Sequence, residues 1–276
     1  MLPWFALVSV QGPDSEAFLQ AQLACDLRQL LPQRWRYAAW CEARGKVDHT
    51  MALGRASADA WHALVPAERA ADFERRVSLY RLRQRVTVQR QAVLVESLAA
   101  GALVFEGDFS ASGPIEFAGL ARVLSSAAGT HDASSEVLRA SGEAGWVWLA
   151  TACAGQHLPQ SLDLLRHGAV SLRKGCYPGQ EIVARVHYLA KGHDKLVELT
   201  ALDDAPTGVD LASTLRCDAG DGSGQILYPF GMPRRALACV KSGSETLLQS
   251  QWQSEDGQQR WRLTRLYAAD TSAPAG

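Results

Sequence analysis

The sequence predicts an α+β protein in which two α+β lobes precede a small β-barrel. Strands and amphipathic helices alternate over residues 1–90, and a second such set occupies residues 91–194. Short strands separated by turns of Gly, Asp and Ser then fill residues 195–270, a pattern typical of a small β-barrel. These three ranges are the predicted domains, with lobes that are free to interleave. Residues 271–276 lack core side chains and are predicted to fray.

The composition narrows the class of protein. The 276 residues carry 28 Lys and Arg against 29 Asp and Glu, a net charge of −1, which excludes a nucleic-acid binder held by bulk charge. No stretch approaches the roughly 18 apolar residues that a membrane helix needs. The six cysteines form no Cys-x-x-Cys pair and show no zinc-ligand spacing, so we expect reduced thiols and no metal site. A cytoplasmic monomer is the resulting expectation.

The first lobe begins with a strand over residues 5–10, which Gly12 and Pro13 terminate. Asp14 is then expected to serve as the N-cap of an amphipathic helix that stops at Pro32. The apolar stripe of this helix steps by three or four residues: Leu19, Leu23, Leu27 and Leu30.

A hairpin and a basic helix follow. Residues 35–41 and 47–53 read as two strands joined by a turn that contains Gly45, and residues 61–65 form a further strand. Pro66 sits where a helix starts, and this helix is expected to end near Arg83. Six arginines in this region predict a solvated face: Arg69, Arg75, Arg76, Arg81, Arg83 and Arg85. The alternative is that they bind phosphate groups, including those of tRNA, or an acidic partner.

The remaining elements are shorter. The second lobe is expected to contain a helix around residues 134–139 and several strands: near 86, 92–95, 103–105, 145–149 and 169–172. The predicted barrel strands cover residues 196–199, 225–227, 236–240, 246–248 and 261–266.

The most informative segment runs from Leu172 to Arg185. A strand is expected to lead into Lys174 and Gly175, and a Pro-Gly turn then starts a helix. Cys176 lies between them, where the ammonium of Lys174 and the positive end of the helix both favour the thiolate. Cys176 and Lys174 are therefore the candidate catalytic residues. The alternative is a small residue that fills a turn beside an exposed lysine.

The run Lys-Gly-Cys-Tyr-Pro-Gly-Gln-Glu, residues 174–181, resembles the signature of the YgfZ family, folate-binding relatives of the glycine cleavage aminomethyltransferase. Flanking segments are similar to the family in the same order: residues 12–26, 39–46, 158–164 and 188–189. Residues 95–145 find no match. The resemblance implies two ferredoxin-like α+β lobes and a C-terminal barrel around a central hole, in which tetrahydrofolate binds.

The resemblance also implies a role. Members support the assembly or repair of iron–sulfur enzymes, including those that thiolate tRNA, so iron–sulfur enzymes or their assembly proteins are the expected partners. Two alternatives stay open, a folate-dependent aminomethyl transferase and a folate-binding module without chemistry. Residues 152–155 lack the acidic residue common in the family, which favours the accessory role over aminomethyl transfer.

Folate-binding residues follow from the same resemblance. Phe5, Trp4 and Trp148 are candidates for stacking on the pterin, with core packing as the alternative. Four residues of the signature helix region are further candidates: Tyr177, Gln180, Glu181 and Arg185. For Glu181 and Arg185, a simple ion pair along the helix is the alternative. Arg44 and Lys46 at the hairpin tip would contact the glutamate tail of the folate. The alternative is that both side chains are simply solvated there.

Overall fold

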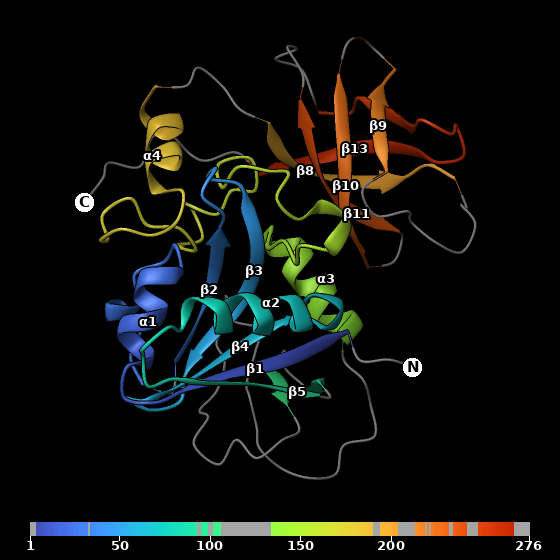
Figure 1. The fold of residues 1–276 in the computed structure, drawn as a ribbon. Coiled ribbons are helices and arrows are strands. Elements are labelled where there is room, and N and C mark those ends of the chain that lie inside the picture. Colours follow the sequence, from blue (N-terminus) through green and yellow to red (C-terminus); the bar gives the residue numbers. More distant parts are fainter. Residues whose placement is uncertain are drawn as a thin grey trace.

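The computed structural model describes residues 4–32, 34–92, 95–98, 102–105, 134–189, 194–203, 213–218, 220, 222–231, 234–241 and 248–267. A twisted antiparallel sheet lies at one end of the molecule and a closed barrel at the other (Figure 1). The segment between residues 145 and 180 runs between them. Among the described helices, none is long and apolar enough to cross a membrane.

The sheet has the strand order β2-β3-β4-β1-β5. Its strands are β1 (Phe5–Gln11), β2 (Arg34–Cys41), β3 (Val47–Arg55), β4 (Ala60–Pro66) and β5 (Thr87–Ala92). Side chains alternate between two cores, as the two-residue period of a strand requires. On β1, Leu7 packs into the core shared with the barrel, whereas Val8 packs beneath helix α2 (Ala67–Tyr80).

The other elements surround this sheet. Helix α1 (Ser15–Gln22) and the 3₁₀ turn η1 (Leu27–Gln29) follow β1, and β6 (Val95–Leu98) pairs only with β7 (Ala102–Phe105) among the described strands. Helix α3 (Ser134–Ala144), the 3₁₀ turn η2 (Thr151–Cys153) and helix α4 (Gln180–Leu189) come next. The division into two lobes stays a prediction.

Six strands close the barrel in the order β10-β11-β8-β13-β12-β9. They are β8 (Lys195–Ala201), β9 (Thr214–Cys217), β10 (Ser223–Phe230), β11 (Arg235–Lys241), β12 (Gln251–Ser254) and β13 (Arg260–Tyr267). Trp252 and Trp261 fill its interior. The predicted barrel is confirmed. Of the predicted strand at 246–248, residues 246–247 lie outside the described residues, and Leu248 is in a turn.

The first helix is shorter than its leucine spacing predicts. α1 ends at Gln22 because the chain turns away to pair with β2, where the Ala24 N–H donates to the Ala39 carbonyl at 2.9 Å. Asp14 occupies the N-cap position, but its carboxylate accepts from the Arg85 backbone N–H at 2.8 Å instead of capping the helix. The second helix also ends early, at Tyr80.

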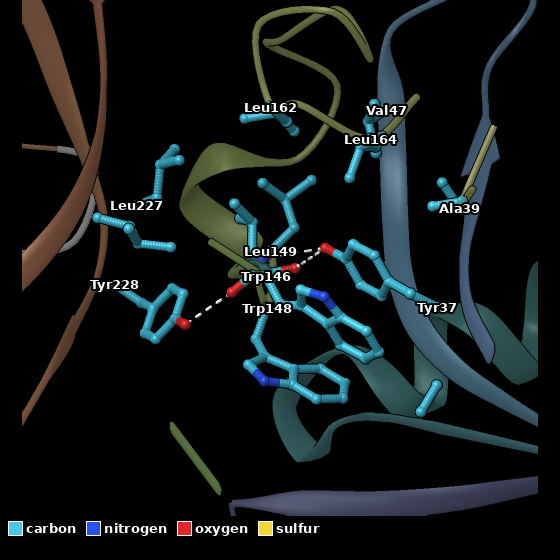
Figure 2. Packing of buried hydrophobic residues seen from close by; sticks show 14 of the residues in the cluster. Tyr37, Ala39, Val47, Trp146, Trp148, Leu149, Leu162, Leu164, Leu227 and Tyr228 are labelled. Atoms are coloured by element: carbon cyan, nitrogen blue, oxygen red, sulfur yellow. Dashed lines mark hydrogen bonds between the residues drawn. The ribbon is translucent and has the colours of Figure 1, made fainter. Parts of the chain in front are cut away.

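Two predicted strands are absent, because their backbone groups bond to partners outside any ladder. In the segment 145–149, the Val147 N–H donates to the Tyr37 hydroxyl at 3.0 Å, and the Leu149 N–H donates to Thr50 Oγ1 at 2.9 Å. The Tyr228 hydroxyl of the barrel donates to the Trp146 carbonyl at 2.7 Å (Figure 2). This segment therefore joins the sheet to the barrel through tyrosine hydroxyls. Residues 169–172 likewise form no strand.

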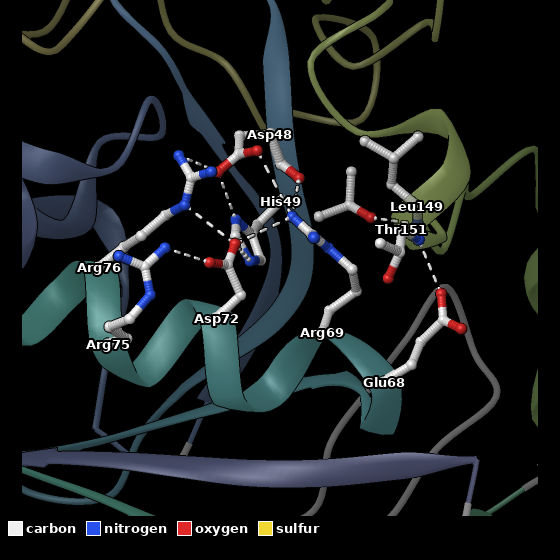
Figure 3. Close-up of polar contacts among 10 residues, drawn as sticks. Asp48, His49, Glu68, Arg69, Asp72, Arg75, Arg76, Leu149 and Thr151 are labelled. Carbon is white, nitrogen blue, oxygen red and sulfur yellow. Dashed lines mark hydrogen bonds and ion pairs between the residues drawn. The ribbon is translucent and has the colours of Figure 1, made fainter.

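Of the six arginines predicted to form a solvated face, Arg69 alone turns inward; Arg76 is half-buried, and the other four, Arg75, Arg81, Arg83 and Arg85, are exposed. Arg69 is buried and reaches Asp48 and Asp72, and Arg76 bonds the same two carboxylates (Figure 3). Arg75 pairs with Asp72 at 2.6 Å. The network fixes α2 onto β3 and balances part of the positive charge seen in the sequence.

Candidate functional site

The segment 173–181 is held against the end of helix α1 by Lys174. Its side chain is 5% exposed, and its ammonium donates to the carbonyls of Gln20 and Leu23. The last carbonyls of a helix lack intrahelical donors and carry partial negative charge, so a cation is favoured there. Burial lowers the pKa of Lys174 to about 8. Lys174 thus caps a helix, and its ammonium is committed to these carbonyls.

The next part of the segment packs against the tip of the β2–β3 hairpin. Gly45 and Gly179 face each other, with φ values of +74° and +79°. A Cβ on Gly179 would lie 2.4 Å from the Glu42 carbonyl oxygen, and one on Gly45 would lie 2.9 Å from Ile182 Cβ. Only glycine permits both this backbone conformation and this approach. The hairpin tip and the start of α4 are therefore fixed to each other.

Cys176 lies on the outside of a small closed loop. The Gln180 side chain donates back to the Lys174 carbonyl at 3.2 Å, and the Gln180 N–H donates to the Tyr177 carbonyl at 3.2 Å. All six cysteines lie in the described residues, and Cys176 is the exposed one; Cys217 is half-buried and the other four are buried. Accessibility therefore singles out the same thiol that the sequence pattern does.

Two buried polar atoms near this loop find no hydrogen-bond partner among the described residues. One is the Tyr177 hydroxyl, whose side chain is 6% exposed, and the other is Gln160 Oε1. The Gln160 amide nitrogen donates to the Val183 carbonyl of α4 at 2.8 Å, which places it beside the same helix. An unpartnered buried donor and acceptor cost free energy and indicate water or a ligand.

The aromatic candidates lie in the core. Phe5, at the start of β1, contacts Trp148 edge to face at 4.8 Å between ring centroids, and both are almost fully buried. Trp4 is 45% exposed, and its carbonyl accepts from the Ala67 N–H at 2.8 Å. Tyr177 belongs to the same core cluster as Phe5 and Trp148. The structure therefore joins these three rings into one core and leaves Trp4 at the surface.

The charged candidates divide into two groups. Lys46 donates to the Gln156 carbonyl at 2.7 Å, whereas Arg44 is exposed at the hairpin tip. Glu181 and Arg185 are both exposed on α4, and no ion pair joins them among the described contacts. Arg185 lies one turn beyond Ile182, the residue that packs on Gly45. Arg44 and Arg185 thus border the same contact between hairpin and helix.

Sequence reasoning missed two contributors to this site. In the sequence, Gln160 is one residue of the segment 158–164 that resembles the family, and its orphaned oxygen becomes visible only in three dimensions. Arg36 holds the neighbouring loop by donating to the carbonyls of Asp26 at 2.7 Å and Gly168 at 2.6 Å. On the sequence it is one basic residue of a strand, so no pattern distinguishes it.

Comparison with known proteins places the fold. No family model matches the chain. The tRNA-modifying protein YgfZ of Klebsiella pneumoniae is 27% identical over 249 residues, covering 79% of this chain and 75% of that protein. The tRNA-modifying protein YgfZ of Vibrio atlanticus is 27% identical over 230 residues, covering 72% and 69%. The crystal structure of glycine cleavage system aminomethyltransferase T from Bartonella henselae superposes with a TM-score of 0.62 at 14% identity, covering 96% of this chain and 83% of that one.

These similarities confirm the predicted resemblance to the YgfZ family and the predicted α+β fold with a C-terminal barrel. The likeness to the aminomethyltransferase concerns the fold alone, since only 14% of the aligned residues are identical.

Proposed function

We propose that this chain is a folate-binding accessory protein that supports assembly or repair of iron–sulfur enzymes, including enzymes that thiolate tRNA. The observation that carries the proposal is the loop 174–180, which presents Cys176 to solvent next to two unpartnered buried polar atoms. Relatives named as tRNA-modifying proteins support the tRNA connection. The bound folate would be tetrahydrofolate, which supplies a reduced pterin and a carrier for one-carbon groups.

The residues divide the work of binding. Tyr177 would donate its free hydroxyl hydrogen to a pterin acceptor, and Gln160 Oε1 would accept from a pterin amine. Arg44 and Arg185 would attract the carboxylates of the glutamate tail from the rim of the hairpin and α4. Phe5 and Trp148 would form the apolar wall behind the ring system. Lys174 would keep the loop in place through α1 and would contact no ligand.

Cys176 would act at the solvent-facing side of this site. Its position on a closed loop limits the directions from which a second macromolecule or a sulfur-containing group can reach it. Iron–sulfur enzymes or their assembly proteins are the partners that such an exposed thiol would serve. The protein would work in the cytoplasm as a monomer.

Complementation tests this role. An Escherichia coli strain that lacks its own tRNA-modifying relative would receive the wild-type gene, Cys176→Ser or Cys217→Ser, and thiolated tRNA nucleosides would be measured by mass spectrometry. We expect wild type and the Cys217 control to restore thiolation and Cys176→Ser to fail. Full restoration by Cys176→Ser would support a folate-binding module without thiol chemistry. Turnover of an aminomethyl donor by the purified protein would instead indicate a one-carbon transferase.

A further inference from the structure

Three side chains of metal-binding type converge where the barrel meets the segment after η2. They are His157, Asp194 at the residue before β8, and Cys239 on β11, and their ligand atoms all lie within 4.8 Å of one another. His157 and Cys239 are buried, and Asp194 is half-buried. We propose that these residues bind a divalent metal ion of the zinc type, at a site distinct from the loop that carries Cys176.

The arrangement fits a metal tripod better than a nucleophile relay. In a Cys-His-Asp relay the thiol and the carboxylate bond opposite nitrogens of the imidazole, which separates sulfur from oxygen by about 7 Å. Here the sulfur and the carboxylate oxygen lie within 4.8 Å of each other. A tetrahedral zinc ion with bonds of about 2.0–2.3 Å brings its ligand atoms to about 3.5 Å apart, within reach of small side-chain rotations.

A chain of hydrogen bonds fixes the tautomer of His157. The Ala152 carbonyl accepts from the Gln156 amide nitrogen, and Gln156 Oε1 accepts from Gln225 Nε2 at 2.9 Å. Gln225 Oε1 is then left to accept from His157 Nε2 at 2.7 Å. Because a backbone carbonyl can only accept, every amide in the chain has one orientation and His157 carries its proton on Nε2. Its Nδ1 lone pair is therefore available, and the Gln225 contact resembles the outer-shell support of metal-bound histidines.

A bound cation would take the place of the thiol proton. In the structure the Cys239 thiol donates to the Ser161 carbonyl at 3.7 Å. Once that proton is replaced by a metal ion, Asp194 and the thiolate bring two negative charges beside Lys46, which donates to the Gln156 carbonyl. Among the described residues no ion pair engages Asp194. A second group of potential ligands consists of Asp48, His49 and Asp72. There Arg69 and Arg76 already bond both carboxylates, and they would repel a divalent ion. At the site of His157, Asp194 and Cys239, the ion would instead balance negative charge.

The site would connect the sheet to the barrel. The Val47 N–H of β3 donates to the His157 carbonyl at 2.8 Å, and the Gly155 N–H donates to the Val47 carbonyl at 2.8 Å. His157 is thus attached to the sheet, whereas Cys239 and Asp194 belong to the barrel. Three protein ligands would leave a fourth coordination position to water or to a further ligand. The metal would consequently stabilise the packing of the barrel against the sheet.

Metal titration of the full-length chain tests this inference. The purified protein would be freed of metal by chelation and titrated with Co²⁺, followed by displacement with Zn²⁺. We expect one ion per chain, the visible bands of four-coordinate Co²⁺, and a near-ultraviolet band from thiolate to metal that Zn²⁺ removes. Zn²⁺ should also raise the midpoint of thermal unfolding.

Variants assign the ligands. Cys239→Ser should lose the thiolate band, whereas the Cys176→Ser control should keep it. Asp194→Asn, at a half-buried position that tolerates substitution, should weaken Co²⁺ binding by about tenfold or more and remove the Zn²⁺ effect on unfolding. Absence of stoichiometric Co²⁺ binding by wild type, or loss of the band in Cys176→Ser instead of Cys239→Ser, would overturn the proposal. Neither readout involves folate, so failure here and failure of the proposed function are distinguishable.

Discussion

Replacing Lys174 by methionine separates a structural role of this residue from a chemical one. The substitution keeps the length of the side chain but removes the donors from two buried carbonyls, Gln20 and Leu23. Each buried acceptor left unpaired costs about 1–3 kcal/mol. Removing the ammonium also removes the free-energy cost of burying its charge, which is about 3 kcal/mol for a pKa lowered from 10.5 to about 8. The net loss of stability at pH 7 is therefore expected to be about 1 kcal/mol.

The pH dependence of stability tests the burial of Lys174 more directly than the stability at a single pH. The folded pKa of Lys174 lies below the unfolded one, so between these values the unfolded chain binds more protons and the stability of wild type rises with pH. Between pH 8 and pH 10 the stability of wild type rises by about 2 kcal/mol from this titration. Lys174→Met lacks the rise because methionine does not titrate. The difference in stability between wild type and variant should therefore widen over this interval.

Urea unfolding of both proteins at several pH values measures this difference, in which the titrations common to both cancel. Lys195→Met supplies the matched control, because Lys195 is exposed, and should alter stability by less than about 0.5 kcal/mol throughout. A difference that stays flat or narrows between pH 8 and pH 10 would refute the burial and capping of Lys174. So would a variant that loses ligand binding while it keeps full stability.

Three further predictions concern other positions. Gly179→Ala should cost at least about 1–3 kcal/mol in urea unfolding because of its φ of +79° and the approach of Glu42, whereas Gly175→Ala, with open space around it, should cost less than about 0.5 kcal/mol. A thiol reagent should label the folded protein first at Cys176, and slow labelling of Cys176 would contradict its exposure. Burial lowers the pKa of His62 to about 4, so on acidification from pH 7 to pH 5 wild type should lose about 2 kcal/mol that His62→Asn does not lose. An equal loss in that variant would reject the buried neutral histidine.

Local patterning predicted most strands of the sheet, the starts of α1 and α2, and the barrel, because alternation and turn residues act within a few positions. β1, the hairpin around Gly45 and the start of α4 all lie within a residue or two of where the sequence places them. The failures have a common cause. The segment 145–149 has the composition of a strand, yet Tyr37, Thr50 and Tyr228 supply its hydrogen bonds from distant elements.

The candidate site shows the same limit. The glycine, cysteine and proline of the signature identify the loop, and its position beside the hairpin follows from Gly45 and Gly179. The destination of Lys174 could not be predicted, because the two carbonyls that it caps lie about 150 residues earlier in the chain. The orphaned oxygen of Gln160 and the convergence of His157 with Cys239 likewise depend on tertiary packing.

Binding of tetrahydrofolate is the most direct test of the central claim. Wild type and Tyr177→Phe would be titrated under anaerobic conditions, with tryptophan fluorescence and calorimetry as the two readouts. We predict saturable binding by wild type and a dissociation constant at least about tenfold higher for Tyr177→Phe, because the free hydroxyl is lost. No binding at millimolar ligand, or equal affinity of the two proteins, would contradict the assignment of the folate site to the loop around Cys176.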